Sequence, residues 1–171
     1  WPNTAKGQGL VTFVGNGTSG ATVAHGLSSA PNLIIIKATN ATDSWVVVTR
    51  GAGVTDYTGR FLNLNYAFND QAYNVSAISA STFTLGNDAQ SNGNNINYQA
   101  FCYHDVAGYS KFSSYTGSGS SGKTVATGFK PAFVMIKRTD DANNWYIMDN
   151  VRTDSSGRPH VLQADTDEAE T

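Results

Sequence analysis

Short apolar or alternating runs, separated by Gly, Pro, Asn and Ser, recur along the whole chain, and this pattern is typical of β-strands joined by turns. Leu33–Ile36 and Phe133–Ile136 are continuous apolar runs, so each is expected to be a central strand buried on both faces. No segment combines a helical period with capping residues. The strands are expected at residues 10–14, 21–25, 32–38, 44–49, 60–65, 73–78, 81–85, 96–104, 111–116, 123–127, 132–138, 144–149 and 160–163. The chain is therefore predicted to be all-β, an antiparallel β-sandwich or jelly-roll-like fold.

One repeat with a period of about 100 residues organises these strands. Residues 15–27 align with residues 117–129, and eight of the 13 positions are identical. Because Gly, Pro, Lys and Trp stay in step, we interpret the chain as a duplication, with a first β-repeat at 1–107 and a second at 108–171. After small gaps, the alignment continues with 31–37 on 131–137, Trp45 on Trp145, and Gly59-Arg60 on Gly157-Arg158.

The second repeat is incomplete at its C-terminal end. The first repeat runs on through Phe61–Leu64, Ser81–Leu85 and Asn97–Tyr103. The second reaches its counterpart of Phe61–Leu64 near Pro159–Leu162, and the sequence ends nine residues later. Two explanations stay open for the remaining strands. Either they lie in the chain beyond Thr171, or a neighbouring chain supplies that surface.

Two Gly-x-Gly-x-x-Gly segments lie at 15–20 and 117–122. Such a motif binds dinucleotides when a helix follows the third glycine. Here it is followed by Ala21-Thr22-Val23 or Lys123-Thr124-Val125, which are β-prone and too short for a helix. The glycines are instead expected to supply positive φ angles in hairpin loops.

Composition narrows the classes of partner. Charged residues make up only 14% of the chain, whereas 50 of the 171 residues are Asn, Ser or Thr, as in many secreted or virion all-β proteins. A net charge of -2 gives no electrostatic reason to expect nucleic acid or anionic lipid. No stretch approaches 18 apolar residues, so membrane insertion is not expected.

Candidate catalytic and metal-binding groups are sparse. His25, His104 and His160 show no metal-ligand spacing, and no metal or other cofactor is expected. Cys102 and His104 lie two apart on a predicted strand and share a face, as a Cys–His nucleophile pair would. A lone strand cysteine is more often a small buried hydrophobe. The chain is therefore expected to be non-enzymatic.

An oxygen-rich loop precedes each of the two aligned tryptophans. Trp45 and Trp145 open apolar strands, and both are expected to lie in the core. Such loops can bind calcium, but an Asx-rich turn between strands is the simpler interpretation. The loop residues are Asn40 and Asp43 in the first repeat and Asp140, Asp141, Asn143 and Asn144 in the second.

Exposed tyrosines among amides, hydroxyls and carboxylates suit sugar binding, because a ring face stacks on C–H groups while amides reach hydroxyls. No spacing in this sequence specifies such a site. The candidate ligand-binding residues are the six loop residues just named together with Tyr57, Tyr66, Tyr73 and Tyr98.

The string Gly15–Pro31, followed by an apolar run that ends in Lys37, resembles a repeat of tail fibre and other appendage proteins of marine bacteriophages, especially cyanophages. Tyr115–Gly119 and Gly128–Thr139 are similar to the second copy of that repeat. The resemblance covers nearly the whole chain. In those proteins the repeat often stands beside concanavalin-like or laminin-G-like domains.

The resemblance implies an extracellular role on the virion surface, structural or in host recognition, and carries no catalytic residues. The expected partners are other virion proteins or copies of the chain in a homo-oligomer, together with bacterial surface polysaccharide. The alternative is a carbohydrate-binding module of a larger secreted protein. A hydrolase would need converging acid and base groups, which the sequence does not show.

Overall fold

The computed structural model describes residues 2–50, 57–70 and 74–170, and it confirms a nearly all-β fold with antiparallel pairing. Two short helices, a 3-10 turn at Thr4–Lys6 and α1 at Ala89–Asn92, interrupt the strands. The strands are β1 (Pro2–Asn3), β2 (Gln8–Val14), β3 (Thr22–Ala24), β4 (Leu33–Ala38), β5 (Val46–Arg50), β6 (Tyr57–Phe61), β7 (Asn69–Asp70), β8 (Val75–Ile78), β9 (Thr82–Leu85), β10 (Asn97–Tyr103), β11 (Phe133–Lys137), β12 (Trp145–Asp149) and β13 (Leu162–Gln163).

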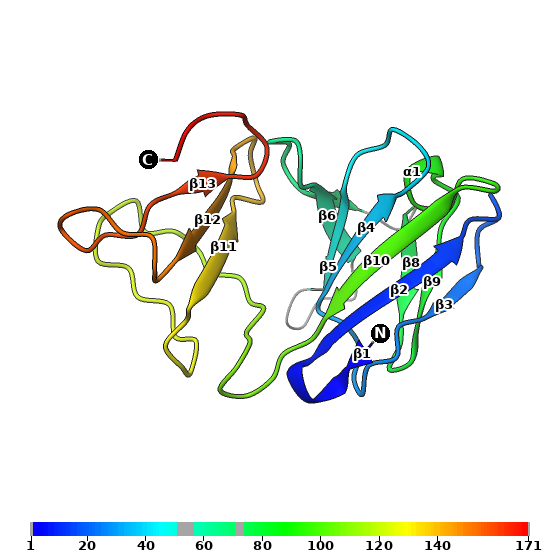
Figure 1. Ribbon diagram of the computed structural model, residues 1–171, viewed down its shortest axis with the longest axis horizontal. Helices are drawn as coiled ribbons and strands as arrows, with labels where there is room; N and C mark the ends of the chain where they lie inside the picture. The colour runs from blue at the N-terminus through cyan, green and yellow to red at the C-terminus, as the bar shows by residue number, and fades with distance from the viewer. Residues whose placement is uncertain (1, 51–56, 71–73, 171) are drawn as a thin grey trace.

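The first ten strands form a sandwich-like pair of sheets (Figure 1). The larger sheet has seven strands in the order β1-β2-β10-β4-β5-β6-β7, and the smaller has three in the order β3-β9-β8. Side chains from both sheets share one core, in which Ile34, Val46, Phe83 and Leu85 are fully or almost fully buried. In β2, β4, β5 and β10, alternate residues face this core, and the intervening residues form the outer face of the sheet.

The continuous apolar run of β4 is a central strand, as the sequence predicts. It pairs with β10 on one side and β5 on the other. Ile34 and Ile36 enter the core of the sandwich, whereas Leu33 and Ile35 belong to a second apolar cluster on the outer face. The strand is therefore apolar on both sides because both sides pack against protein.

The remaining strands, β11, β12 and β13, form a separate three-stranded sheet. Its pairing repeats that of β4 and β5 with every residue number raised by 100: Leu33 pairs with Thr49 and Phe133 with Asp149. The next strand differs from the sequence alignment, because Gln163 occupies against Tyr146 the place that Phe61 has against Val46.

Two expectations for the second half are wrong. Residues 111–116 and 123–127 are predicted strands, but none of the described residues 111–132 is in a strand. Phe133–Ile136 is predicted to be central, but β11 is an edge strand and Phe133 is 60% exposed. In the first half, the equivalent segments pair with β10 and β9, and the second half has no strand in those places among its described residues.

The glycine-rich loops have the predicted backbone but a different connection. Gly17, Gly20, Gly119 and Gly122 all have positive φ angles, from 68° to 97°, which favour glycine. The loop at 15–20 is not a hairpin, however, because β2 and β3 lie in different sheets. It carries the chain from one layer of the sandwich to the other.

The two halves are joined by packing and hydrogen bonds around Trp145. Its indole Nε1 donates to the carbonyl of Phe61 at 3.0 Å, and its ring lies 5.6 Å from that of Phe68. Backbone bonds run from Phe68 N to Thr139 O (2.9 Å) and from Asn143 N to Asn65 O (2.8 Å). The second sheet therefore packs on the outer face of the first, near β5 and β6.

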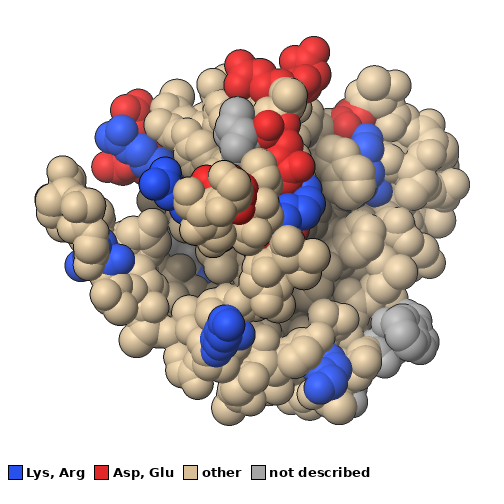
Figure 2. All heavy atoms as spheres, turned by 60° about the vertical axis from the view of Figure 1, so that its left-hand side comes forward, with Lys and Arg blue, Asp and Glu red and all other residues tan. Residues whose placement is uncertain are grey.

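Within the described residues, no helix has the length and apolar character needed to cross a membrane. Figure 2 views the molecule with the second half forward, and most of the surface shown is uncharged. Asp and Glu are confined to the upper part of that view, and the lower part carries only scattered Lys and Arg.

Candidate functional site

The part of the outer face that the second half leaves open carries an aromatic pair. Trp45 precedes β5 and Phe101 lies in β10, and their ring centroids are 6.3 Å apart with planes tilted by 30°. Trp45 is 37% exposed and Phe101 is partly exposed. We call this surface the β2–β10 face and define it by Leu10, Thr12, Lys37, Trp45, Gln99 and Phe101.

The two aligned tryptophans have opposite environments. Trp145 is 3% exposed, which confirms its predicted core position, but Trp45 is not a core residue. Each backbone N–H is capped in the same way, Trp45 by Asn63 Oδ1 at 2.9 Å and Trp145 by Asp165 Oδ1 at 3.0 Å. The difference arises because Trp145 is pressed against the first half, whereas no described residue covers Trp45 in that way.

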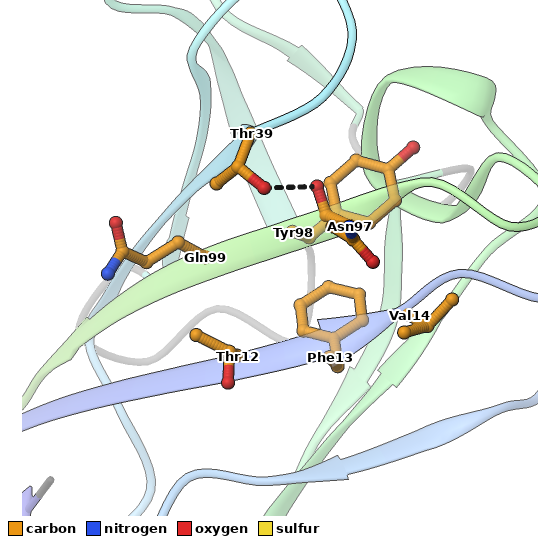
Figure 3. A pocket seen from close by; sticks show the side chains of 7 residues that line it. All are labelled: Thr12, Phe13, Val14, Thr39, Asn97, Tyr98 and Gln99. Carbon is orange, nitrogen blue, oxygen red and sulfur yellow. Dashed lines mark hydrogen bonds between the residues drawn. The ribbon is translucent and has the colours of Figure 1, made fainter.

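A shallow groove of about 380 Å³ lies at one end of the β2–β10 face (Figure 3). Its polar groups are hydroxyls and amides, and the Thr39 hydroxyl donates to the carbonyl of Asn97 at 3.2 Å. The ring of Phe13 stacks on that of Tyr98, with centroids 5.2 Å apart. The lining residues are Thr12, Phe13, Val14, Thr39, Asn97, Tyr98 and Gln99.

A second groove of about 140 Å³ lies at the other end of β2 and β10. Phe101 of the aromatic pair is one of its lining residues, so the pair borders this groove, and the two grooves follow one another along β2 and β10. Its lining residues are Asn3, Gln8, Gly9, Leu10, Phe101 and Tyr103. This arrangement places aromatic rings and uncharged polar groups along the same two strands, which suits a hydroxyl-rich ligand.

Tyr98 is not the exposed sugar platform that the sequence suggests. Only 1% of the residue is exposed, because it lies on the core side of β10. Its hydroxyl donates to the carbonyl of Ala89 and accepts from the N–H of Gly93 at 2.8 Å. Burial raises the pKa of its hydroxyl above the usual value of 10.0, so it stays protonated at neutral pH. Tyr98 thus anchors α1 and the following turn.

The other tyrosine candidates lie elsewhere or outside the described residues. Tyr66 is 46% exposed, and the guanidinium of Arg60 lies 5.2 Å from its ring centroid. Tyr57 begins β6, but its side chain is outside the described part of the chain, as is all of Tyr73. Of the four tyrosines, Tyr66 alone is described with an exposed ring, and no groove described above includes it.

The first oxygen-rich loop supports the groove by hydrogen bonding. Asn40 Oδ1 accepts from the N–H of Asn97 at 2.8 Å, at the start of β10. The carbonyl of Asp43 accepts from Lys37 Nζ at 2.6 Å. The loop therefore holds the end of β10 and fixes the position of the one lysine on the β2–β10 face.

The side chains of the second oxygen-rich loop form ion pairs and hydrogen bonds with other residues of the second half. Arg138 forms ion pairs with Asp140 at 2.9 Å and Asp141 at 3.2 Å, and its hydrogen bond holds the pKa of Asp140 below the usual 3.8. Asn144 Nδ2 donates to Gln163 Oε1, and Asn143 bonds to the first half through its backbone. These contacts fit the Asx-rich turn. Among the described residues, no three His, Cys, Asp or Glu side chains gather as a metal ion would require.

Cys102 is buried on the core side of β10 and is unsuited to be a nucleophile. Burial raises the pKa of its thiol to about 12, so almost none is thiolate at neutral pH. His104 instead bonds to its neighbours, through Nδ1 with the carbonyl of Asp105 at 2.7 Å and through Nε2 with Ser28 Oγ at 3.5 Å.

We expect the Cys102 thiol to be unreactive in the folded protein. A colorimetric disulfide reagent at pH 8 should react with less than about a tenth of the protein over an hour, because reaction requires opening of the core. In guanidinium chloride it should titrate one thiol per chain, since the sequence contains one cysteine. Rapid reaction without denaturant would contradict the burial of this side chain.

His25 is a buried group whose titration is linked to folding. Its Nδ1 accepts the Leu27 N–H at 3.1 Å, so the ring is neutral with its proton on Nε2, which donates to the Ser79 carbonyl at 3.3 Å. Burial, with a smaller effect from His104, lowers the pKa of His25 below the usual 6.5. The unfolded chain therefore binds more protons than the folded one just below pH 6.5.

We expect the free energy of unfolding to fall as the pH falls below about 6.5, until the folded pKa of His25 is passed. Urea unfolding between pH 7.5 and 5.5 would measure this slope, above the range in which most carboxylates titrate. In His25→Asn, Oδ1 can still accept the Leu27 N–H but the residue cannot titrate. The slope should therefore shrink in that variant, and an unchanged slope would show that other groups cause it.

Sequence reasoning missed the aromatic pair for an identifiable reason. Trp45 precedes an apolar strand, which resembles the start of a core element. The available signal was the alternation in β10. Tyr98, Ala100 and Cys102 are buried, and the two residues between them, Gln99 and Phe101, face outward. That alternation places an aromatic ring beside an amide on one face.

Comparison with known proteins assigns the family but no activity. No curated protein and no solved structure matches the chain. The sequence matches one family over residues 2–171, which is nearly its whole length. The chain therefore belongs to the family described as a domain of unknown function, DUF7483.

Proposed function

We propose that the chain is a non-enzymatic structural and adhesion module of a phage tail fibre or similar surface appendage, exposed on the virion, and that it contacts host surface glycan through the β2–β10 face. The observation that carries the glycan contact is the pair of Trp45 and Phe101, of which Phe101 lines one shallow groove, with a second groove farther along β2 and β10. The appendage role is supported by the resemblance of Gly15–Lys37 to the marine phage repeat.

The geometry of the face suits a polysaccharide better than a small metabolite. Ring faces stack on the apolar C–H side of a sugar, and neighbouring Thr12 and Gln99 offer a hydroxyl and an amide to its hydroxyl groups. Both grooves are open and lie in line along β2 and β10, so a chain of several sugar units can follow them. Lys37 is the only charged member of the face, so the ligand we propose is neutral or weakly acidic.

We also propose that the chain is an internal duplication of one sandwich, in which β11, β12 and β13 correspond to β4, β5 and β6. The support is the shared register of β4–β5 and β11–β12 and the shared N–H caps of the two tryptophans. Under this proposal the counterpart of Phe61 is Gln163, and Gly157 is not equivalent to Gly59. A jelly-roll-like chain path stays a prediction.

The alternative function is a carbohydrate-binding module of a larger secreted protein, which would use the same face. The two differ in assembly, because an appendage module is expected to form symmetric oligomers and a binding module to be monomeric. Sedimentation equilibrium separates them: a trimer or other symmetric oligomer favours the appendage, and a monomer that binds sugar favours the module.

Trp45→Ala is expected to weaken polysaccharide binding at least about tenfold, because truncating a tryptophan that acts as a binding hot spot costs about 2 kcal/mol or more. The measurement is binding of fluorescently labelled protein to bacterial cells and to a panel of their surface polysaccharides. Because Trp45 is partly exposed, its loss should change the melting temperature little, which a thermal scan would check.

Tyr115→Ala is the matched control, because Tyr115 is an exposed aromatic residue that lies outside the β2–β10 face. It should bind as the unaltered protein does. Equal binding by Trp45→Ala and the unaltered protein would reject this face as the site. If the folded protein binds no polysaccharide at all, the adhesive part of the proposal fails and a spacer role in the appendage is left.

A further inference from the structure

The second sheet leaves only partly covered the side that, in the first half, faces the core of the sandwich. Met135, Trp145 and Ala164 pack against the first half. Successive side chains of a strand point to opposite faces, so Val134, Ile136, Tyr146 and Met148 point away from it. Their counterparts at 34, 36, 46 and 48 are all fully buried, whereas these four are only partly buried.

The hydrogen-bonding edge of the same sheet is also open. β11 pairs with β12 on one side, and within the described residues no strand pairs with its other side. Residues 111–116 and 123–127, which align with β2 and β3, are exposed over most of their length and lie outside any strand. Phe133 and Val125 are exposed apolar residues in this region. A partly exposed apolar sheet face with an open edge is a surface that another strand can cover.

The first half shows what covers the equivalent surface. There, β10 pairs with both β2 and β4, and β9 pairs with β3. Phe83, Leu85 and Val75, on β9 and β8, close the core over the apolar residues of β4 and β5. One continuous segment, residues 74–103, therefore supplies both the missing edge partner and the missing cover.

We propose that the second half is an acceptor for a polypeptide segment of the β8–β10 type, which pairs with β11 and with residues 111–116 and 123–127 and closes a second sandwich. The occupant is a further copy of the repeat's own C-terminal strands: a run with the alternation of Asn97–Tyr103, preceded by a β8–β9 hairpin. The mode of binding is β-augmentation, in which backbone hydrogen bonds supply affinity and alternate side chains supply specificity. This inference rests on the proposed duplication and is independent of glycan binding.

The test is to supply the segment to the full chain. A second copy of residues 74–105 is joined after Thr171 through a short Gly/Ser linker, and amide hydrogen exchange is measured residue by residue. We expect the amides of β11 and of residues 123–127 to exchange at least about tenfold more slowly than in the unextended chain. Binding of a dye specific for exposed apolar surface should fall.

The control is the same extension with Ala100→Pro and Cys102→Pro in the appended copy only. Proline cannot donate to a strand ladder, so this copy should not protect β11. Equal protection by the two extensions, or none by either, would overturn the proposal. Protection that appears only in a dimer supports it, because the appended copy then occupies the face of the neighbouring chain. Polysaccharide binding is measured on the same proteins, so a failure of the glycan proposal is seen separately.

Discussion

Trp145→Ala is expected to lower the free energy of unfolding of the second half by about 3–5 kcal/mol, as truncation of a buried tryptophan commonly does. The indole fills the junction between the halves, against Phe68 and the fully buried Val47. Its removal leaves a cavity and takes the shorter of two hydrogen bonds from the Phe61 carbonyl, which keeps only the bond from the Leu64 N–H at 3.4 Å. Trp145 is the one buried residue of the second sheet in this apolar cluster. In the variant, the second sheet should therefore separate from the first half before the first half unfolds.

Trp45→Ala is the matched control for this prediction, because the two tryptophans occupy equivalent positions and have similar N–H caps. Truncation of the partly exposed Trp45 should cost about 1 kcal/mol or less. Urea unfolding would compare the variants, with amide exchange of β4 and β12 to resolve the halves. Trp145→Phe should fall between them, because it keeps most of the ring and loses the hydrogen bond. Equal losses for the two alanine variants would contradict the buried junction.

The alternation and turn pattern predicted most of the longer strands of the first half, because these find their partners within the chain. It did not predict the two-residue strands β1 and β7, and it placed a strand at 60–65 where β6 lies at Tyr57–Phe61. Leu33–Ile36 is a central strand, and its sequence has the apolar run that such a strand needs. Phe133–Ile136 has the same kind of run but lies at an edge. An apolar run indicates that a strand can be buried on both faces. It does not indicate whether the neighbouring strands and the opposite sheet are present.

The candidate site was less predictable, because exposure of an aromatic residue depends on which way one strand faces. Tyr98 and Phe101 lie three apart in β10 and therefore on opposite faces, one inside the core and one outside. Trp45 has its environment decided by how far the second half extends over the outer face, which is a tertiary property. Residue type alone selected the tyrosines. Trp45 and Phe101 are identified as candidates only when the two-residue period of the strands is combined with the position of the second half.

Gly59 has a close backbone contact that no other residue type fits. A Cβ at this position would lie 1.9 Å from the carbonyl oxygen of Val47 and 2.8 Å from its carbonyl carbon. These are backbone atoms of β5, which is paired on both sides, so neither can move without disturbing the large sheet. Gly157, its partner in the sequence alignment, is free of such contacts and is instead required for a positive φ of 77°.

Gly59→Ala is therefore expected to lower the free energy of unfolding by about 3 kcal/mol, because the added methyl must push β6 away from β5. Gly117→Ala is the control, since a Cβ there meets nothing within 4 Å and its φ is not positive. That change should be neutral or slightly stabilising, because alanine restricts the unfolded chain more than glycine does. Urea unfolding measures both effects. A Gly59→Ala loss no larger than that of Gly117→Ala would mean that β6 is not held against Val47 as the structure shows.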